Sequence, residues 1–381
     1  MGIGPVELTL SRLLILLGLA ALLLTEGARG ELFRTRLEIP LVLLLVAGLV
    51  TTVKWGTEPR YRFLVESVAL FYLAFAVARA RPDGRRALVA VALVAMALSA
   101  LAGIAQISQG EATGFYRDGC EPVTAPPPVI PGGTITRATG TFSNPNLLAG
   151  HLLLLAPLGA VAVAGLGAGF QLRLVMGLAV GLGYAGLALT YSRSAIFFGL
   201  AALGVAAVVS GMRHKWAIAG VGAALAIGST FLFAACGSEA GAGYGRTQEW
   251  KDTVTIATDN PVYGIGLGRV GDALRANDPR ANTRHAHNLF LNWWAEAGPL
   301  ALIAWIWILG ALLWRSLRAS LRGDPLARAA LVALVGFTGF SLLDHPANVD
   351  RVAIAFWIVA ALAAAVTAGA RDPVRTTSSG P

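Results

Sequence analysis

Two histidines stand at the start of an apolar stretch, in "RHAHNLFLNWWAEAG", residues 284–298. A neutral imidazole that faces a polar cavity can act as a general base at neutral pH. The plainer alternative is that His287 only caps the start of a helix, and spacing alone leaves both readings open. On a regular helix His285 and His287 would point roughly 200° apart, so they could not share one metal. No His-Glu-x-x-His spacing accompanies them, so the sequence predicts no zinc site here.

Other ionisable residues stand within or beside apolar runs, where such groups are the default functional candidates. They are Glu66, Arg193, Glu296, Asp344 and His345. The span assignments below place all of them at one face of the membrane. Pumps and ion-coupled transporters usually hold such groups near the midplane. This one-sided distribution instead indicates a site that works on the outer leaflet.

The composition indicates that these residues are positioned by membrane-spanning helices. Of 381 residues 56% are hydrophobic and only 13% are charged, with mean hydropathy +0.66, whereas a soluble domain has roughly 25% charged residues. The apolar runs are continuous, which predicts helices rather than alternating barrel strands. We therefore expect an all-α polytopic membrane protein, with residues 1–381 forming one integral membrane domain. The net charge of +9 comes mostly from loop arginines, so it does not indicate a nucleic-acid partner.

About 11–12 transmembrane helices are expected. The first apolar run has no signal-peptide cleavage pattern and is taken as a retained helix. Long loops are predicted at 109–145 and 237–290. The predicted spans are 7–25, 38–54, 63–80, 86–108, 146–168, 172–191, 194–211, 216–236, 291–314, 326–343 and 351–370.

Basic residues predict the orientation. The loops after odd-numbered spans, with the tail, hold sixteen Lys and Arg residues, and the short loops on the other side hold five. Positive loops stay in the cytoplasm, so both long loops are expected outside, in the periplasm. The N-terminus would also lie outside, unless a twelfth span reverses one end. Cys120 and Cys236 fall on the same outer side, and the sequence leaves open whether they pair.

The second long loop combines balanced charge with a glycine-rich stretch. It holds six basic and six acidic residues, so any anion would be bound by particular arginines and not by a generally basic surface. The stretch "YGIGLGRVG" (263–271) lacks the strand and helix that a dinucleotide-binding fingerprint requires. It is interpreted as a tight, closely packed turn region.

Four local patterns occur in a fixed order along the chain. They are "RATGTFSNPNLLAGHLLLLAPL" (137–158), "LTYSRSA" (189–195), "GRTQEWKDTVTIATDNPVYGIGLG" (245–268) and "HAHNLFLNWWAEAGPLAL" (285–302). Together they resemble the O-antigen ligase/polymerase family, which includes O-antigen ligases, O-antigen polymerases and bacterial protein O-oligosaccharyltransferases. The ligase-type pattern of His, then Asn, Ser or Gln, nine residues and Gly is matched by His287, Asn288 and Gly298. Its continuation, a Gly, Thr or Tyr after two more residues, is not matched, because Ala301 stands there.

The resemblance implies an inverting glycosyltransferase of the GT-C type, without metal or cofactor, in the bacterial inner membrane. The implied donor is a glycan on undecaprenyl diphosphate at the periplasmic leaflet. His287 would be the catalytic base, and Arg193, Arg246 and the further candidate Arg137 would hold the diphosphate. Supporting roles fall to Asn288, His285 and Glu249.

The acceptor stays open at this point. Lipid A-core would make the protein an O-antigen ligase, a second lipid-linked glycan would make it a polymerase, and a protein acceptor would make it an oligosaccharyltransferase. Membrane lipids are the other expected partners. A non-enzymatic exporter or flippase is a remote alternative, because it would explain the many spans but not a histidine at the ligase-type spacing.

Overall fold

The computed structural model describes residues 10–26, 34–80, 83–109, 124–125, 135–165, 169–211, 245–281, 283–348 and 350–369. The predicted span 216–236, Cys120 and Cys236 lie outside these ranges. The helices are α1 (Leu10–Glu26), α2 (Glu38–Trp55), α3 (Glu58–Ala80), α4 (Gly84–Gln109), α5 (Pro145–Gly165), α6 (Phe170–Leu189), α7 (Arg193–Val209), α9 (Arg246–Asp259), α10 (Val270–Asn277), α11 (Leu289–Leu321), α12 (Pro325–Ser341) and α13 (Asp350–Gly369), with a 3₁₀ turn at Pro346–Asn348.

The predicted fold class is confirmed: the protein is an all-helical, polytopic membrane protein. Ten of the eleven predicted spans coincide with a helix, and the eleventh is the span outside the described residues. Helices α2, α3, α4 and α11 are each long and apolar enough to cross a membrane, and several shorter apolar helices accompany them. A minimal antiparallel ladder joins β1 (Thr124–Ala125) to β2 (Ile135–Thr136).

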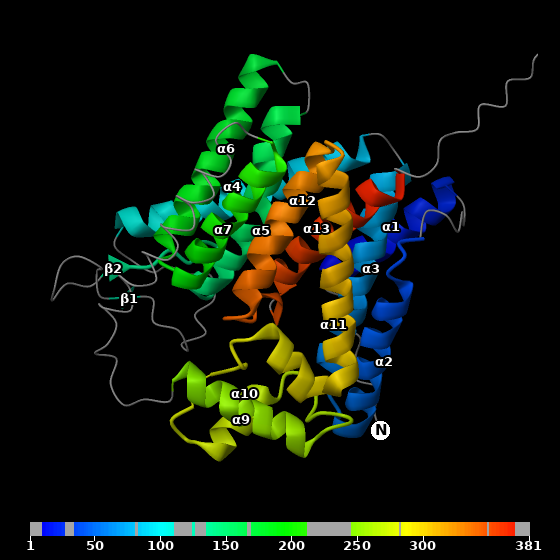
Figure 1. The fold of residues 1–381 in the computed structure, drawn as a ribbon, viewed down its shortest axis with the longest axis vertical. Helices are drawn as coiled ribbons and strands as arrows, with labels where there is room; N and C mark the ends of the chain where they lie inside the picture. Colours follow the sequence, from blue (N-terminus) through cyan, green and yellow to red (C-terminus); the bar gives the residue numbers. More distant parts are fainter. Residues whose placement is uncertain are drawn as a thin grey trace, which may run out of the picture.

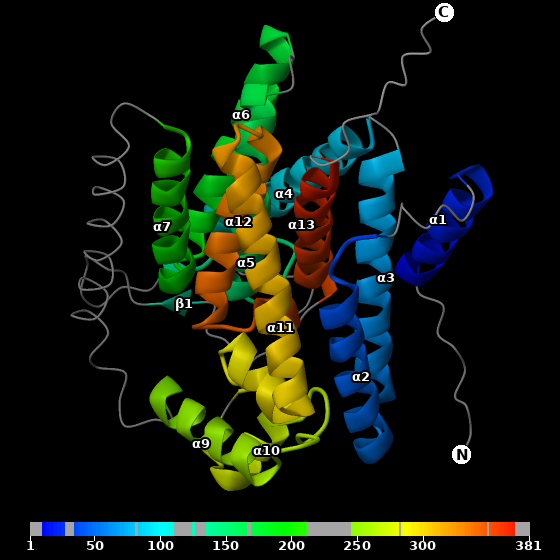
Figure 2. The ribbon, with the colours of Figure 1, turned by 45° about the vertical axis from the view of Figure 1, so that its right-hand side comes forward.

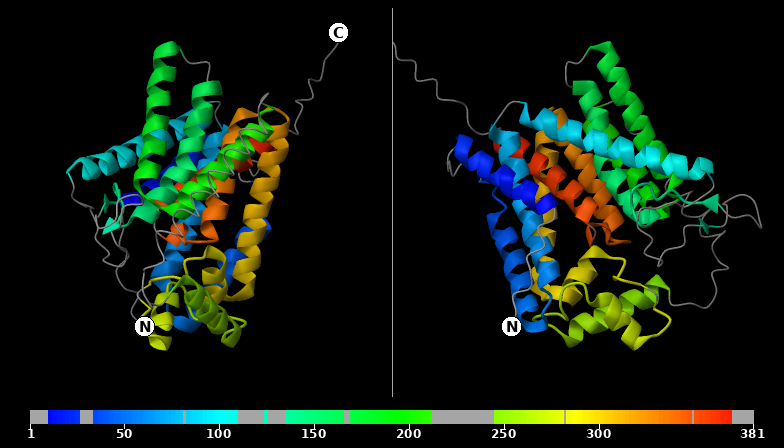
Figure 3. Two further views of the ribbon diagram at one scale, coloured as in Figure 1. Left: turned by 60° about the vertical axis from the view of Figure 1, so that its left-hand side comes forward. Right: turned by 180° about the vertical axis from the view of Figure 1, so that it is seen from behind.

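The long helices form a bundle, in which α2 lies along α11, α3 along α13, and α5 between α6 and α12 (Figures 1 and 2). Helix α4 crosses the back of the bundle at a steep angle to its neighbours (Figure 3). Buried aromatic rings fill the centre, where Phe337 stacks on Phe356 and Trp305 packs against Phe356 and Trp357.

Helices α9 and α10 lie across one end of the bundle as a separate layer (Figure 1). The sequence predicts a long loop at 237–290, and the structure corrects this by showing two helices in its described part. Helix α9 buries Glu249, Thr253, Ile256 and Ala257, which recur with helical spacing on one face. Two of these four side chains are polar, so hydropathy alone could not reveal the helix.

Helix α11 breaks where the sequence reads Gly298-Pro299. Gly298 has φ 79° and ψ −177°, and Pro299 has no N–H to offer the Ala295 carbonyl. The glycine-rich stretch replaces the lost donor, since Ile265 N–H donates to Ala295 O at 2.9 Å and Gly266 N–H donates to Glu296 O at 3.0 Å. The predicted tight turn is therefore confirmed, and it joins the α9–α10 layer to the bundle.

Glycine is required at the centre of this joint. Gly264 has φ +61°, and a Cβ there would lie 2.4 Å from the Glu296 carbonyl carbon. Both the left-handed backbone and the close approach exclude a larger side chain.

The loops predicted on the outer side contact one another. Trp55 Nε1 donates to Gly264 O, Arg137 Nε to Thr190 O, Asn288 Nδ2 to Leu342 O, and Arg351 to Thr141 O. These bonds connect the loops after the second, fourth, sixth, eighth and tenth predicted spans. The alternation of the spans thus brings these five loops to the same end of the bundle, the end that α9 and α10 cover (Figure 2).

Candidate active site

His287 is paired with a buried carboxylate from α9. Its Nδ1 lies 2.8 Å from Glu249 Oε1 and 3.1 Å from Oε2. The Glu249 side chain is 5% exposed and that of His287 is 15% exposed. A carboxylate accepts hydrogen bonds, so it favours the tautomer with the proton on Nδ1 and leaves Nε2 to take a proton. This is how a base is held in orientation by a third group in hydrolytic triads.

The backbone that carries His287 is not helical, because α11 begins only at Leu289. The reasoning that two histidines two positions apart must diverge on a helix is therefore wrong for this segment. His287 has φ +42°, one of three non-glycine residues with positive φ in the described chain. Its N–H donates to His285 Nδ1 at 3.2 Å, and Thr283 Oγ1 donates to His285 O at 2.6 Å. Sparsely populated backbone of this kind clusters at functional sites.

Asn288 fixes the segment to two helices. Its Oδ1 accepts from the N–H groups of Phe290 and Leu291, both at 3.0 Å, as the N-cap of α11. Its Nδ2 donates to Leu342 O at 2.9 Å, in the turn between α12 and α13. Both ends of the amide are therefore used to hold the loop.

The turn between α12 and α13 also binds Arg246, which is the first residue of α9. Its Nη1 donates to Leu343 O at 2.8 Å, and the residue is otherwise exposed. Arg246 and Glu249 are three positions apart on α9, so their side chains lie on one face of the helix. Because Glu249 binds His287, the structure brings Arg246 and His287 together although 41 positions separate them (287 − 246).

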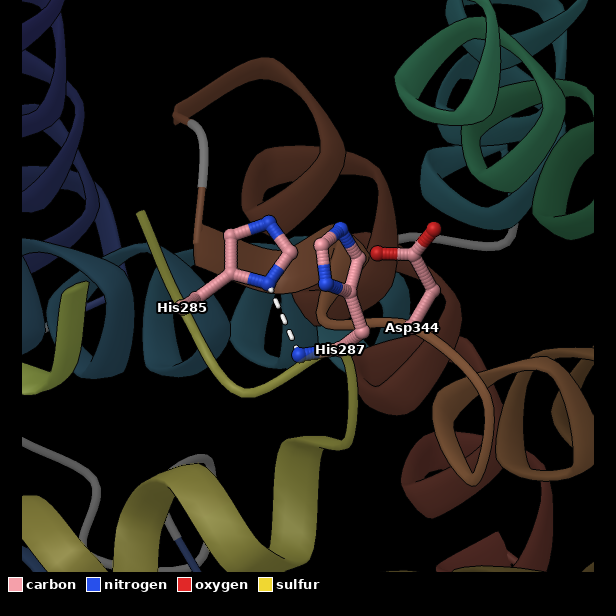
Figure 4. A group of neighbouring side chains, drawn as sticks. All are labelled: His285, His287 and Asp344. Carbon is pink, nitrogen blue, oxygen red and sulfur yellow. Dashed lines mark hydrogen bonds between the residues drawn. The ribbon is translucent and has the colours of Figure 1, made fainter. Parts of the chain in front are cut away.

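The turn also contributes Asp344 and His345, which are both buried. Asp344 Oδ1 accepts from His345 N–H at 2.7 Å, and the His345 ring lies 5.7 Å from the His285 ring. The His285 and His287 rings are 4.5 Å apart, and the Asp344 carboxylate faces them from the other chain segment (Figure 4). The sequence marked Asp344 and His345 only as charged groups at the outer face, since nothing in its spacing links them to His285.

His285, His287 and Asp344 can be tested as a metal site, because one ligand atom from each lies within 4.8 Å of the others. His287 could offer Nε2 with Glu249 behind it, which is a common arrangement at metals. His285, however, already uses the lone pair of Nδ1 to accept from the His287 N–H. A neutral imidazole has only one such lone pair, so His285 could bind a metal only by releasing that amide. The arrangement thus fits a metal-free base better than a three-ligand centre.

Burial keeps His285 and His345 neutral. It lowers the pKa of His345 to about 3, with Arg60 and His287 adding repulsion, and lowers the pKa of His285 well below its usual value. In the unfolded chain both would titrate near pH ~6.5. Between that pH and their native pKa values the unfolded state binds more protons, so stability falls as the pH falls below ~6.5.

We therefore expect the thermal midpoint of the purified protein to drop between pH 7.5 and pH 5.5. Each of the two histidines should lower the free energy of unfolding by up to ~1.4 kcal/mol for each unit that the pH falls. His345→Asn should show a shallower pH dependence, measured by thermal unfolding at the same pH values. An equally steep fall of the thermal midpoint in the variant would show that His345 does not contribute to the pH dependence.

Arg137 and Arg193 lie on either side of the turn between α6 and α7, at the same end of the bundle. Arg137 Nε donates to Thr190 O at 2.9 Å and its Nη2 donates to Asn146 Oδ1 at 3.1 Å. Thr190 precedes Tyr191, which has φ +49° and turns the chain into α7, where the exposed Arg193 is the first residue. Arg137 thus supports the turn that presents Arg193.

A small cavity with a few polar groups in a mainly apolar wall lies behind His345. It has a volume of about 40 Å³ and is lined by Arg60, Ser67, Glu296 and His345 together with Trp293, Trp305 and Trp357. This is room for a few water molecules, far below the roughly 300–1,000 Å³ of small-molecule sites. The buried Glu296 therefore belongs to the support of the site and not to a glycan pocket.

The tryptophan pair at the start of α11 contacts two different parts of the protein. Trp293 packs against Trp305 with ring centres 5.7 Å apart, and Trp294 packs against the buried cluster that includes Ile256 and Leu274. The pair thus ties the bundle to the α9–α10 layer.

One family model matches the segment that carries most of these residues. Residues 177–306 match the family model described as O-antigen ligase. This range is about a third of the chain and contains Arg193, Arg246, Glu249 and His287. No curated protein matches the chain. Over residues 177–306, this match agrees with the family that the sequence motifs indicate.

Proposed function

We propose, because residues 177–306 place the chain in the O-antigen ligase family, that it transfers a glycan from a polyprenyl diphosphate to an acceptor hydroxyl. Membership makes the protein an O-antigen ligase/polymerase-type membrane glycosyltransferase. The observation that carries the mechanism is the His287–Glu249 pair beside Arg246. We place this end of the bundle in the periplasm, which the distribution of basic loops supports.

The chemistry follows from the positions of these groups. The acceptor O–H gives its proton to His287 Nε2 while its oxygen bonds to the anomeric carbon from the face opposite the diphosphate. The bond from that carbon to the phosphate oxygen breaks, and its electron pair leaves with the diphosphate, so the configuration inverts. Glu249 stabilises the imidazolium that forms, as the carboxylate does in a triad. The imidazolium then releases the proton to solvent before the next cycle.

Arginines offset the charge that develops on the leaving group. A guanidinium presents a planar fork of donors that matches phosphate oxygens. One N–H group of Arg246 donates to Leu343 O, and this hydrogen bond orients the rest of the guanidinium. We assign Arg193 to the same diphosphate from the start of α7, with Arg137 as its support. Preorganised donors of this kind can perform the task of a metal ion.

The acceptor we propose is lipid A-core, so the protein is an O-antigen ligase in the bacterial inner membrane. The departure from the ligase-type pattern at position 301 does not argue against this. Ala301 is fully buried in the core beyond the break of α11, so it is a packing position and does not contact substrate. A polymerase that joins two lipid-linked glycans, or a transferase onto protein, would use the same donor site.

A purified-protein assay with one lipid-linked glycan and three acceptors tests the proposal. We expect product on lipid A-core. An elongated glycan on the polyprenyl carrier would instead identify a polymerase, and a glycosylated protein an oligosaccharyltransferase. Movement of the donor across a reconstituted membrane without a new glycosidic bond would overturn the enzymatic proposal altogether.

Replacement of Glu249 tests the orientation of the base. Glu249→Gln should lower the turnover number by on the order of 10²-fold with a smaller effect on KM, because the amide no longer fixes the Nδ1–H tautomer or stabilises the imidazolium. Initial rates at saturating acceptor measure this. Asp252→Asn is a matched control, since Asp252 is a half-buried acid on the same helix and accepts from Gln248. Equal losses in both variants would point to damage of α9 and not to the pair.

Chelation tests the metal-free mechanism. Activity should survive excess EDTA within about twofold, because His285 has no free lone pair for a third ligand. The measurement compares rates before and after chelator treatment of the same preparation. Full loss of activity, with recovery on added zinc, manganese or magnesium, would show that His285, His287 and Asp344 hold a required metal.

A further inference from the structure

An apolar groove opens beside the break of α11, away from the catalytic residues. At Gly298 the helix departs from its path, and the turn at 261–263 packs so closely that a Cβ on Gly298 would lie 2.3 Å from Val262 O. The groove has a volume of about 310 Å³. Its lining residues are Ala47, Val50, Pro261, Val262, Tyr263, Ala297, Pro299 and Leu300.

Exposed aliphatic side chains continue the groove onto the surface of a membrane-spanning helix. Val50 is 40% exposed, Val53 is 79% exposed and Val262 is 62% exposed. Val50 and Val53 belong to α2, which is long and apolar enough to cross the membrane. In a membrane that α2 crosses these side chains would face hydrocarbon, so we infer that the groove opens toward the lipid phase.

Two cations stand at the end of the groove, held by aromatic rings. Lys54 Nζ lies 5.0 Å from the Trp55 ring centre and 4.7 Å from that of Tyr263, and Arg269 Cζ lies 5.6 Å from the Trp55 ring centre. Trp55 is itself fixed by its Nε1–H, which donates to Gly264 O at 2.9 Å. Lys54 is four positions beyond Val50, so both project from one face of α2.

This combination is the chemistry of a lipid with a negative headgroup. Tryptophan and tyrosine favour the depth of the headgroups, the groove accepts a hydrocarbon chain, and the two cations match a phosphate. We propose that the groove binds one acyl chain of an anionic phospholipid, whose headgroup phosphate is held by Lys54 and Arg269.

The groove is separate from the place proposed for the donor lipid. It lies at the C-terminal end of α9, beside Pro261, whereas Arg246 begins that helix and Glu249 is in its first turn. A helix of this length spans roughly 20 Å. The proposal therefore concerns a phospholipid of the membrane and stands whether or not the protein transfers glycan.

Native mass spectrometry of the purified full chain tests it. The protein is titrated with phosphatidylglycerol or with phosphatidylcholine of the same acyl chains. The wild type should retain one phosphatidylglycerol with a roughly 10- to 30-fold preference, since each cation near the headgroups favours anionic lipid by about fivefold. The double variant Lys54→Gln, Arg269→Gln should lose that preference. A wild type that retains both lipids equally would overturn the proposal.

A matched control uses another cation over a tryptophan. Arg318 Cζ lies 5.2 Å from the Trp314 ring centre, near the far end of α11. Arg318→Gln should leave the preference for the single tightly retained lipid unchanged. If it removed the preference as fully as the double variant does, the lipid would bind through charge in general and not in this groove. If undecaprenyl phosphate displaced the phosphatidylglycerol one for one, the groove would belong to the polyprenyl carrier, which also contradicts the proposal. Equal thermal midpoints of all variants show that the fold is intact.

Discussion

A chain that carries His287→Gly should transfer glycan at least ~10²-fold, and up to ~10⁴-fold, more slowly than the wild type, while it reaches the membrane in normal amount. This is the range that a positioned general base contributes. Sugar hydroxyls are poor nucleophiles at neutral pH, and His287 Nε2 is the nitrogen that the Glu249 contact leaves to take the proton. Initial rates with purified protein measure the loss.

Glycine at position 287 separates the effect of losing the imidazole from the effect of backbone strain. His287 has φ +42°, a conformation that costs most L-residues ~1–2 kcal/mol but glycine nothing. His287→Ala removes the same ring but keeps that strain, which glycine relieves. We expect both variants to be inactive, with the alanine variant less stable to heat. Near wild-type activity in the glycine variant would exclude His287 as the base, whatever happens to the alanine variant.

Arg246→Ala should lower the turnover number by ~10²–10³-fold, the usual loss when one preorganised donor to a developing negative charge is removed. Arg246→Lys should be nearly as damaging. The guanidinium bonds Leu343 O with one nitrogen and has others for the diphosphate. A lysine ammonium is a single point, so it cannot hold the turn and present a planar fork to phosphate at once.

Arg280→Lys is the control for this substitution. Arg280 lies in the same outer segment, is exposed and pairs only locally with Asp278, its Nη2 2.6 Å from the carboxylate. Its replacement should change the rate by less than about twofold, since exposed ion pairs contribute little. If Arg246→Lys retained most of the activity, charge alone would suffice at this position and the fork would be unnecessary.

The spans were predictable because their signal is local and strong. An apolar run of about 20 residues has few alternatives to a membrane helix. The Gly298-Pro299 pair, where α11 breaks, was visible in the sequence. The single predicted span 291–314 nevertheless passed through it. A Gly-Pro pair breaks a helix at low cost only when other donors bond the freed carbonyls, and here the donors are the N–H groups of Ile265 and Gly266. That contact cannot be seen in a window of neighbouring residues.

The sequence could name candidate residues for the site, but it could not predict how they are arranged. Motif resemblance identified His287, Arg246 and Arg193, and marked Glu249 only as support. The bond between Glu249 and His287 joins residues 38 positions apart and depends on α9, whose polar sequence hides its helical pattern. His285 was given a loop-bonding role, and the structure shows its Nδ1 accepting the His287 amide. Its contact with His345 arises from the turn between α12 and α13, which no spacing rule connects to it.

The joint between the α9–α10 layer and the bundle is made of main-chain bonds, from Ile265 and Gly266 to the carbonyls of α11. Main-chain donors are the same for every residue type except proline. The side chain at position 265 can therefore change during evolution while the joint is kept, but the glycine at 264 cannot. Exposed side chains of α9 and α10 can thus vary while main-chain bonds keep this layer, and with it the His287–Glu249 pair, in register with α11.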